Sequence, residues 1–169
     1  TPLLYGGTID SFKKIYPEFG IEVDVTDDPY DPQAFEKAVT HQTKAIFVES
    51  ISNPNAIVAD LKALAEIAHR HGIPLIVDNT IATPYLENPF DFGADVVVYS
   101  ATKGISGHGN VIGGLVLEKG GFDWTNGNFP SLTKPYYTLR DKTGRLRSYA
   151  EVFPDAPFTA RIRSVYLNY

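Results

Sequence analysis

The chain has 169 residues, 43% hydrophobic and 21% charged, which is ordinary for a globular protein with room for one well-buried domain. Its formal net charge of −5 argues against a nucleic-acid-binding protein, which normally carries a basic face. Its apolar runs are too short for a membrane span. The absence of cysteine excludes disulfides, thiolate chemistry and Cys-based zinc sites, and it fits a cytoplasmic location.

Apolar periodicity predicts helices and strands that alternate along the chain. The expected helices span residues 9–16, 32–39 and 61–71. The expected strands span residues 21–25, 45–48, 73–77, 94–99 and 114–117. Asp31 and Asp60 stand where N-cap residues are expected, and Gly72 stands where a helix-ending glycine is expected.

Most of these strands are continuous apolar runs separated by amphipathic helices. This pattern predicts an α/β fold with a mostly parallel sheet that is flanked by helices on both faces. In open sheets of this kind, ligands bind beyond the carboxyl ends of the strands. Polar residues gather at three of those ends, in segments 49–53, 78–80 and 100–103. This coincidence indicates a binding site at that edge.

The character of the sequence changes over residues 120–157, which are rich in Gly, Pro, Tyr and charge and have no sustained periodicity. We expect a long loop excursion there, acting as a lid or a subunit contact. The chain contains no methionine, opens on Thr1-Pro2-Leu3 and stops within the helix-like stretch 164–169. We therefore expect it to be a fragment of a longer polypeptide.

Asp78 and Lys103 are the strongest candidates for chemistry. A carboxylate directly after a buried strand is either a structural anchor or a functional acid, and a lone lysine there is ordinarily a solvated surface residue. Together they can hold pyridoxal 5′-phosphate (PLP), because the lysine amine forms an imine and the aspartate pairs with the ring nitrogen. Ser100 and Thr102 add two hydroxyls that could donate to the cofactor phosphate.

Two further residues have both an ordinary and a functional interpretation. Tyr5 is either a loop aromatic or a ring beside a planar cofactor. Asn53 precedes Pro54, which favours a bare turn, but its place at a strand end allows a cofactor contact. The glycine-rich stretch 104–114 lacks the Gly-Lys-Ser/Thr ending of a phosphate loop, so we interpret it as close backbone packing behind Lys103. The sequence predicts no metal site.

Four motifs follow one another in the order of a known family. They are Tyr5-Gly-Gly-Thr8, Glu49-Ser-Ile-Ser-Asn-Pro54, Val77-Asp-Asn-Thr-Ile-Ala-Thr-Pro-Tyr85, and Ser100-Ala-Thr-Lys103 followed by Gly107-His-Gly109. Over nearly its whole length the chain resembles the Cys/Met-metabolism family of PLP-dependent transsulfuration enzymes. The resemblance implies the aspartate-aminotransferase fold (fold type I), with residues 1–169 a fragment of its large PLP-binding domain.

The resemblance also implies a role for each candidate residue. Lys103 would bind the cofactor covalently and later move protons, and Asp78 would keep the pyridine nitrogen protonated. Tyr5 would stack on the ring and exchange a proton with the incoming amine or the leaving group. The remaining candidates would contact the phosphate and the ring hydroxyl: Ser100, Thr102 and Asn53.

Segments 121–124, 128–130 and 160–163 resemble the O-acetylhomoserine sulfhydrylase branch of the family. That branch implies γ-replacement, in which acetate leaves O-acetylhomoserine and sulfide or a thiol adds to give homocysteine or methionine. It also implies a role in methionine biosynthesis. The family further implies a homo-oligomer, a dimer-based tetramer with sites shared between subunits.

Several alternatives stay open. Gly104 stands where the family often has an aromatic residue and Ile81 where it usually has Phe, although neither change removes a catalytic group. Elimination as in methionine γ-lyase, cystathionine γ-synthase activity and a catalytically inactive scaffold all remain possible. A class I aldolase-type lysine explains neither Asp78 nor the hydroxyl pair. The family's upstream phosphate loop and carboxylate-binding arginine lie outside this sequence, so we expect the fragment alone to be inactive.

Overall fold

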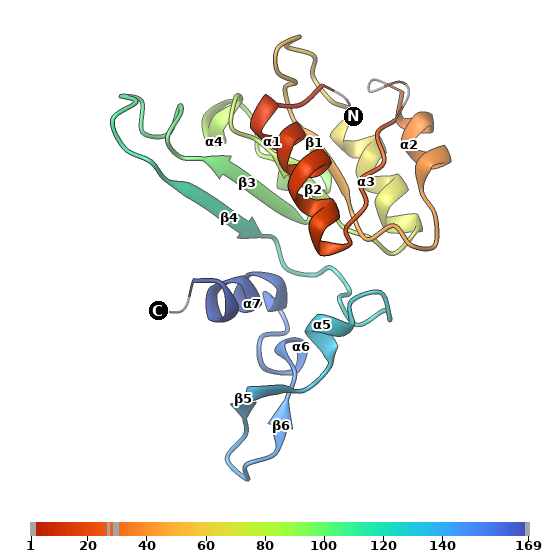
Figure 1. Cartoon of the computed structure of the whole chain (residues 1–169), viewed down its shortest axis with the longest axis vertical. Helices are drawn as coiled ribbons and strands as arrows, with labels where there is room; N and C mark the ends of the chain where they lie inside the picture. The colour runs from red at the N-terminus through yellow and green to blue at the C-terminus, as the bar shows by residue number, and fades with distance from the viewer. Residues whose placement is uncertain (1–2, 27, 29–30, 168–169) are drawn as a thin grey trace. The chain divides into compact units, whose positions relative to one another are not determined.

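In a computed structural model of the chain, the described residues are 3–26, 28 and 31–167. They belong to two compact units, Thr1–Leu115 and Val116–Tyr169 (Figure 1). The opening Thr1-Pro2 and the last two residues of the stretch 164–169 lie outside the described residues. None of the helices in the described ranges has the length and apolar character that crossing a bilayer requires.

A 4-stranded sheet with the order β1-β2-β3-β4 forms the centre of the first unit and extends into the start of the second. Its strands are β1 (Ile46–Glu49), β2 (Leu75–Asp78), β3 (Val96–Ser100) and β4 (Gly114–Glu118). The first three are parallel, with Val48 beside Val77 and Val77 beside Val97. β4 follows β3 in the strand order. The predicted α/β class with a mostly parallel sheet is confirmed.

Helices precede and connect the strands. They are α1 (Gly6–Asp10), α2 (Pro32–Ala38), α3 (Leu61–Arg70) and α4 (Thr83–Leu86), with a π-helical turn η1 (Ser11–Ile15) and 3-10 turns η2 (Tyr16–Phe19) and η3 (Pro89–Phe92). The Asp31 side chain accepts from Gln33 N at 2.9 Å, and the Asp60 side chain accepts from Ala63 N at 3.0 Å. Both predicted N-caps are confirmed.

The two faces of the sheet are covered by different helices. Leu64 and Ala68 of α3 are 3% and 0% exposed and belong to a buried cluster with residues of all three parallel strands, Val48, Leu75 and Val97 among them. Each leucine or valine side chain buried in this way stabilises the fold by about 1.5–3 kcal/mol. On the opposite face, the ring of Phe12 in η1 packs edge-on against Phe47 of β1, with ring centroids 5.2 Å apart. This two-sided cover leaves the carboxyl ends of β1, β2 and β3 together at one edge.

The predicted strand over residues 21–25 is wrong. The segment has no regular structure, and within the described residues it pairs with no strand. Ile21 and Val25 are 50% and 41% exposed. Alternating side chains alone do not make a strand, because its backbone N–H and C=O groups need partners on a neighbouring strand.

The predicted helix over residues 9–16 is longer at both ends. Helical structure begins at Gly6 and continues through η1 and η2 to Phe19. Pro17 does not end it, because this proline lies in the first turn of η2, where a missing N–H leaves no bond unmade. Gly20 ends the run instead, with φ of 71°.

Short elements occupy much of the segment 120–157, for which the sequence predicts a long loop excursion. The second unit contains α5 (Pro130–Thr133), β5 (Tyr136–Arg140), β6 (Leu146–Arg147), α6 (Tyr149–Val152) and α7 (Pro157–Val165). β5 and β6 form an antiparallel hairpin. Helices of 4 residues and a strand of 2 are too short to produce a periodic pattern, so periodicity could not predict them.

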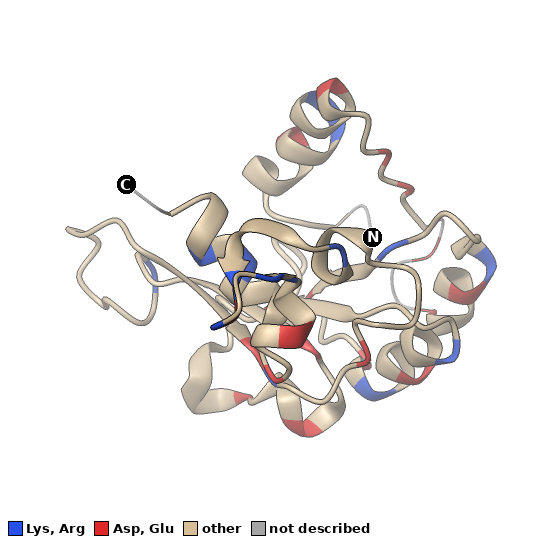
Figure 2. Cartoon of the chain, turned by 90° about the horizontal axis from the view of Figure 1, so that it is seen from below, with Lys and Arg blue, Asp and Glu red and all other residues tan. Residues whose placement is uncertain are grey.

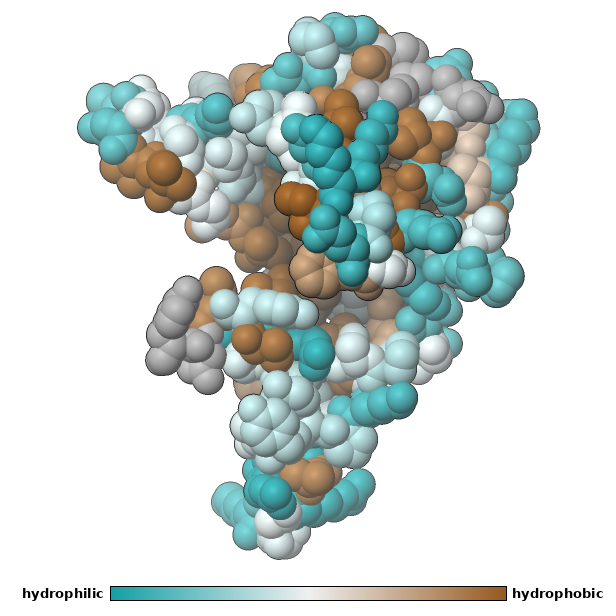
Figure 3. All heavy atoms as spheres, viewed as in Figure 1, coloured by the Kyte–Doolittle hydropathy of each residue, from teal (hydrophilic) through white to brown (hydrophobic). Residues whose placement is uncertain are grey.

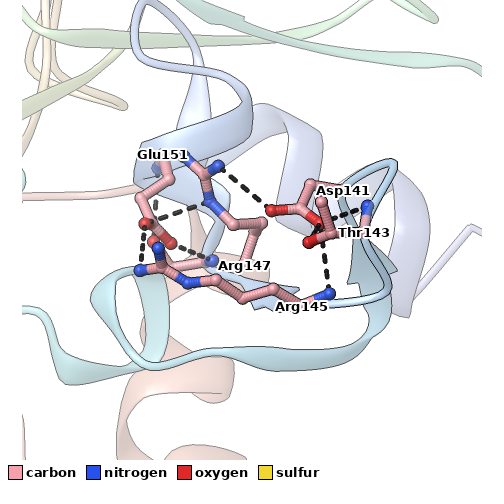
Figure 4. Close-up of polar contacts among 6 residues, drawn as sticks. Asp141, Thr143, Arg145, Arg147 and Glu151 are labelled. Carbon is pink, nitrogen blue, oxygen red and sulfur yellow. Dashed lines mark hydrogen bonds and ion pairs between the residues drawn. The ribbon is translucent and has the colours of Figure 1, made fainter.

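Polar contacts join the hairpin to α6 in this unit (Figure 4). Ser148 and Glu151 form a reciprocal capping box at the start of α6, and Glu151 Oε1 also lies 3.1 Å from Arg147 Nε. In the hairpin turn, Asp141 Oδ1 accepts from the Thr143 hydroxyl at 2.6 Å. The Arg147 and Glu151 side chains keep 31% and 37% exposure, so their ion pair contributes little to stability.

The surface is mixed in character. Lys and Arg are interspersed with Asp and Glu along the chain (Figure 2). Apolar side chains are also exposed, as Figure 3 shows, and in the first unit they include Val111 and Ile112 just before β4, with 60% and 96% exposure. Leu115, Val116 and Leu117 of β4 are exposed as well, so these apolar residues form a nearly continuous exposed stretch of the sequence.

Candidate functional site

Three polar residues end three neighbouring strands. Glu49 ends β1, Asp78 ends β2 and Ser100 ends β3. In the register of the sheet, Glu49 lies directly beside Asp78, and Asp78 lies beside Val98, two residues before Ser100. The parallel strands therefore bring the three predicted polar segments to one edge.

Asp78 is half-buried and is connected to Ser100 through a third residue. Asp78 Oδ1 accepts from Thr80 N at 2.9 Å and from the Thr80 hydroxyl at 2.5 Å. Thr80 Oγ1 in turn accepts from Ser100 N at 2.8 Å. In the described part of the chain, the second carboxylate oxygen of Asp78 has no hydrogen-bond partner. That oxygen is available to a donor such as a protonated ring nitrogen.

Lys103 lies close to Tyr5. Its Nζ is 5.7 Å from the centroid of the Tyr5 ring, within the range of a cation–π contact. The Lys103 backbone N donates to Ser100 O at 3.0 Å, so a tight turn places the lysine just beyond β3. The exposed Lys103 side chain forms no ion pair with Asp78 in the described ranges. The amine and the carboxylate are thus delivered to the same edge without neutralising each other.

The ring of Tyr5 occupies space that only glycine leaves open. A Cβ on Gly7 would lie 2.8 Å from Tyr5 Cε1, closer than real Cβ contacts come. Tyr5 itself is 54% exposed and stands at the N-cap of α1. The second glycine of the Tyr5-Gly-Gly-Thr8 motif therefore has a steric reason in this structure.

Glu49 forms hydrogen bonds to the backbones of the candidate residues Tyr5 and Asn53. Its Oε1 accepts from Tyr5 N at 2.6 Å, and its Oε2 accepts from Asn53 N at 3.0 Å. Burial raises the pKa of this carboxyl above its ordinary value, the nearby charge of Asp78 adds to the rise, and the bonds from Tyr5 and Asn53 oppose it. The side chain is 7% exposed.

The two candidate phosphate ligands differ. The Ser100 hydroxyl has no hydrogen bond within the described part of the chain, so it is ready to donate. Thr102 Oγ1 accepts from Gly113 N at 2.9 Å and donates to Gly113 O at 3.2 Å. To donate to a phosphate, the Thr102 hydroxyl must give up this longer bond, while it can still accept from Gly113 N.

Glu49 and Thr80 were not among the residues singled out from the sequence. The spacing of Asp78 and Thr80 is a recognisable signal, since a hydroxyl two residues after an acid commonly bonds to it. The contact of Glu49 with Tyr5 has no such signal, because it spans 44 positions.

The groups at this edge fit PLP chemically. They comprise a primary amine, a carboxylate oxygen that is free to accept, an aromatic ring and a hydroxyl that is free to donate. Each corresponds to one part of the cofactor: the aldehyde, the ring nitrogen, the ring face and the phosphate.

Comparison with known proteins gives the same result. Residues 1–144 match the family model described as "Cys/Met metabolism PLP-dependent enzyme". The chain is 43% identical over 152 residues to O-acetyl-L-homoserine sulfhydrylase of Corynebacterium glutamicum, covering 90% of this chain and 35% of that protein. It is 42% identical over 174 residues to homocysteine/cysteine synthase of Kluyveromyces lactis, covering 99% and 37%. The chain thus spans little more than a third of the length of these relatives.

Solved structures agree. An O-acetylhomoserine (thiol)-lyase of Campylobacter jejuni, whose crystal structure contains a pyridoxyl-lysine phosphate, superposes with a TM-score of 0.85 at 34% identity, over 97% of this chain and 39% of that one. Cystathionine gamma-lyase of Lactobacillus plantarum has a TM-score of 0.66 at 40% identity, over 69% and 30%. The expected fold type I class and the expected family of PLP-dependent enzymes are confirmed. On these matches and this geometry, the chain belongs to the Cys/Met metabolism family of PLP-dependent enzymes.

Proposed function

We propose that this chain carries the PLP site of an enzyme that replaces the γ-substituent of O-acetylhomoserine by sulfide or a thiol, giving acetate and homocysteine or methionine. The edge where β1, β2 and β3 end carries the proposal, because it brings an acceptor carboxylate, an amine and an aromatic ring to one place. The names of the similar proteins from C. glutamicum and C. jejuni support the substrate class.

PLP, when bound, withdraws electrons from the bonds at the substrate Cα, which is the chemistry that γ-replacement needs. In this proposal, the residues of this chain hold the cofactor and move protons. The Lys103 amine would hold the cofactor and would be placed to carry protons between substrate carbons. The Asp78 carboxylate keeps the proton on the ring nitrogen. Tyr5 covers the ring, and its hydroxyl exchanges a proton with the incoming amine or the leaving group.

Three residues orient the cofactor in this proposal. The Ser100 hydroxyl is free to donate to the phosphate, and the Thr102 hydroxyl joins it by exchanging its bond to Gly113 O. The Asn53 side chain contacts the ring hydroxyl, from a backbone position that Glu49 fixes.

The remaining expectations concern the whole protein. We expect residues 1–169 to be part of the large domain, with the segment 120–157 serving as an excursion from it. We also expect a dimer-based tetramer in the cytoplasm, acting on an amino-acid substrate without nucleic acid, membrane or metal as a partner. Analytical ultracentrifugation of the full-length protein tests the tetramer.

Visible absorbance tests the cofactor site. The full-length protein with PLP should show the band of lysine-bound cofactor, and Lys103→Ala should lose it. Lys62→Ala, on the exposed side of α3, is the matched control and should keep the band. A full-length protein without any band under saturating PLP would refute the cofactor site and leave the inactive scaffold.

Product analysis tests the reaction. O-acetylhomoserine is supplied with and without sulfide, and homocysteine should form only with sulfide. If α-keto acid and ammonia dominate under both conditions, the reaction is elimination, as in a C–S lyase. Formation of cystathionine from cysteine, with no homocysteine formed from sulfide, would indicate a cystathionine γ-synthase instead.

A further inference from the structure

We propose that Glu49 is a positioning residue of the cofactor site: its carboxylate ties the backbones of Tyr5 and Asn53 to the end of β1. This inference rests on the proposed PLP site and deepens it. Glu49 itself is assigned no contact with cofactor or substrate. Its role is to fix the two segments that carry two of the cofactor-binding residues.

The carboxylate uses one oxygen for each segment. Oε1 accepts from Tyr5 N at 2.6 Å and Oε2 accepts from Asn53 N at 3.0 Å. Hydrogen bonds to an ionised acceptor are about twice as strong as neutral ones. The two donors lie 44 positions before and 4 positions after Glu49 in the chain. A single side chain therefore crosslinks the entry to α1 with the turn that follows β1.

Because of its surroundings, Glu49 could be ionised only at a high cost in free energy without its two hydrogen-bond donors. Glu49 is 7% exposed and lies directly beside Asp78 in the register of β1 and β2. Burial and a neighbouring like charge both disfavour an ionised carboxyl, and they raise the pKa of Glu49. Accepting two backbone N–H groups offsets this penalty, so the positions of these backbones and of the carboxylate depend on one another.

Fixing the Tyr5 backbone also fixes its ring. Tyr5 is the N-cap of α1, and its carbonyl accepts from Thr8 N at 2.9 Å and Ile9 N at 3.0 Å. Its ring lies over Gly7, where any Cβ would approach to 2.8 Å, and it stands 5.7 Å from Lys103 Nζ. A shift at Tyr5 N is therefore passed to the ring that faces the lysine.

Glu49→Gln tests the inference with almost no change in volume. An amide has one acceptor oxygen, so one of the two N–H groups would face an NH2 donor instead. We expect the apoprotein of full-length Glu49→Gln to bind PLP about 10-fold more weakly, a loss of about 1.4 kcal/mol. The affinity is measured by titrating the apoprotein and following the visible band. Glu66→Gln, on the exposed side of α3, is the matched control and should bind as wild type does.

A double-mutant cycle separates positioning from general stability. If Glu49 acts through Tyr5, then Glu49→Gln should weaken PLP binding clearly less in a Tyr5→Ala background than in the wild type. A merely structural Glu49 would give the same factor in both backgrounds. The same cycle is measured with Asn53→Ala in place of Tyr5→Ala. If the losses in PLP binding free energy are additive in both cycles, the inference is overturned.

The outcomes for this residue differ from those for the proposed function. A wild-type protein that binds no PLP refutes the site itself, whereas equal PLP affinities of wild type and Glu49→Gln refute only the role of Glu49. If Glu49→Gln does not fold, the same titration with Glu49→Asp decides. That variant keeps the charge but withdraws it by one methylene, so it should bind PLP more weakly than wild type, and equal affinity would again refute the role.

Discussion

Thr80→Val removes the hydroxyl that bridges two strand ends of the site while keeping the size and branching of the side chain. In the structure, that hydroxyl donates to Asp78 Oδ1 at 2.5 Å and accepts from Ser100 N at 2.8 Å. Valine can do neither. The Ser100 N–H loses its acceptor, and the Asp78 carboxylate keeps only the hydrogen bond from Thr80 N.

The magnitude follows from these two losses. A backbone N–H left without a partner in a partly buried place costs about 1–3 kcal/mol. Thr80 and Ser100 are half-buried, which places the cost near the middle of that range. The lost hydroxyl–carboxylate bond adds about 1 kcal/mol, since Asp78 is also partly solvated. We therefore expect Thr80→Val to lower the free energy of unfolding by about 3 kcal/mol.

Urea unfolding of the full-length apoprotein measures the change. Thr125→Val is the matched control, because Thr125 makes the same local pair of bonds to Asp123, at 2.9 and 2.6 Å, in an exposed loop. It should cost about 1 kcal/mol or less. Thr80→Ser keeps the hydroxyl and should recover most of the loss. Equal effects of Thr80→Val and Thr125→Val would refute the bridge to Ser100 as the source of the cost.

Two further predictions concern the packing and the titration of the site. Gly104→Ala should lower the free energy of unfolding by about 1–3 kcal/mol, because the added Cβ would lie 2.6 Å from Thr83 Cγ2. Thr83→Ser removes that methyl group and should therefore restore stability to Gly104→Ala. A double variant that is no more stable than Gly104→Ala would contradict the clash. The raised pKa of Glu49 means that the folded state binds more protons than the unfolded state between the ordinary value of 4.5 and the raised value. The contribution of Glu49 to the free energy of unfolding should therefore fall as pH rises through that window. Urea unfolding measured across pH should show this fall in the wild type and not in Glu49→Gln. Identical pH profiles of the two proteins would contradict the prediction.

The gathering of the candidate residues at one edge of the sheet was predictable from the pattern of apolar strands. Asp78 and Ser100 each follow an apolar run directly and Lys103 lies three residues further on, and parallel strands between helices must place such ends at one edge. The difference between the Ser100 and Thr102 hydroxyls, one without a hydrogen bond in the described residues and one bonded to Gly113, was not predictable. The Thr102 hydroxyl is bonded to Gly113, 11 positions away in the chain, and no local pattern predicts that contact.

The sequence alone determined the features that depend on near neighbours. Caps at Asp31 and Asp60, the apolar strands and the family motifs are all read within a few residues, because helix capping and side-chain periodicity are local. The tertiary structure decided the partners of backbone groups that no local rule assigns. It left residues 21–25 without a strand to pair with, and it brought Tyr5 to Glu49. The physical reason is that a hydrogen bond needs both partners in place, and packing of the whole chain fixes where the distant partner lies.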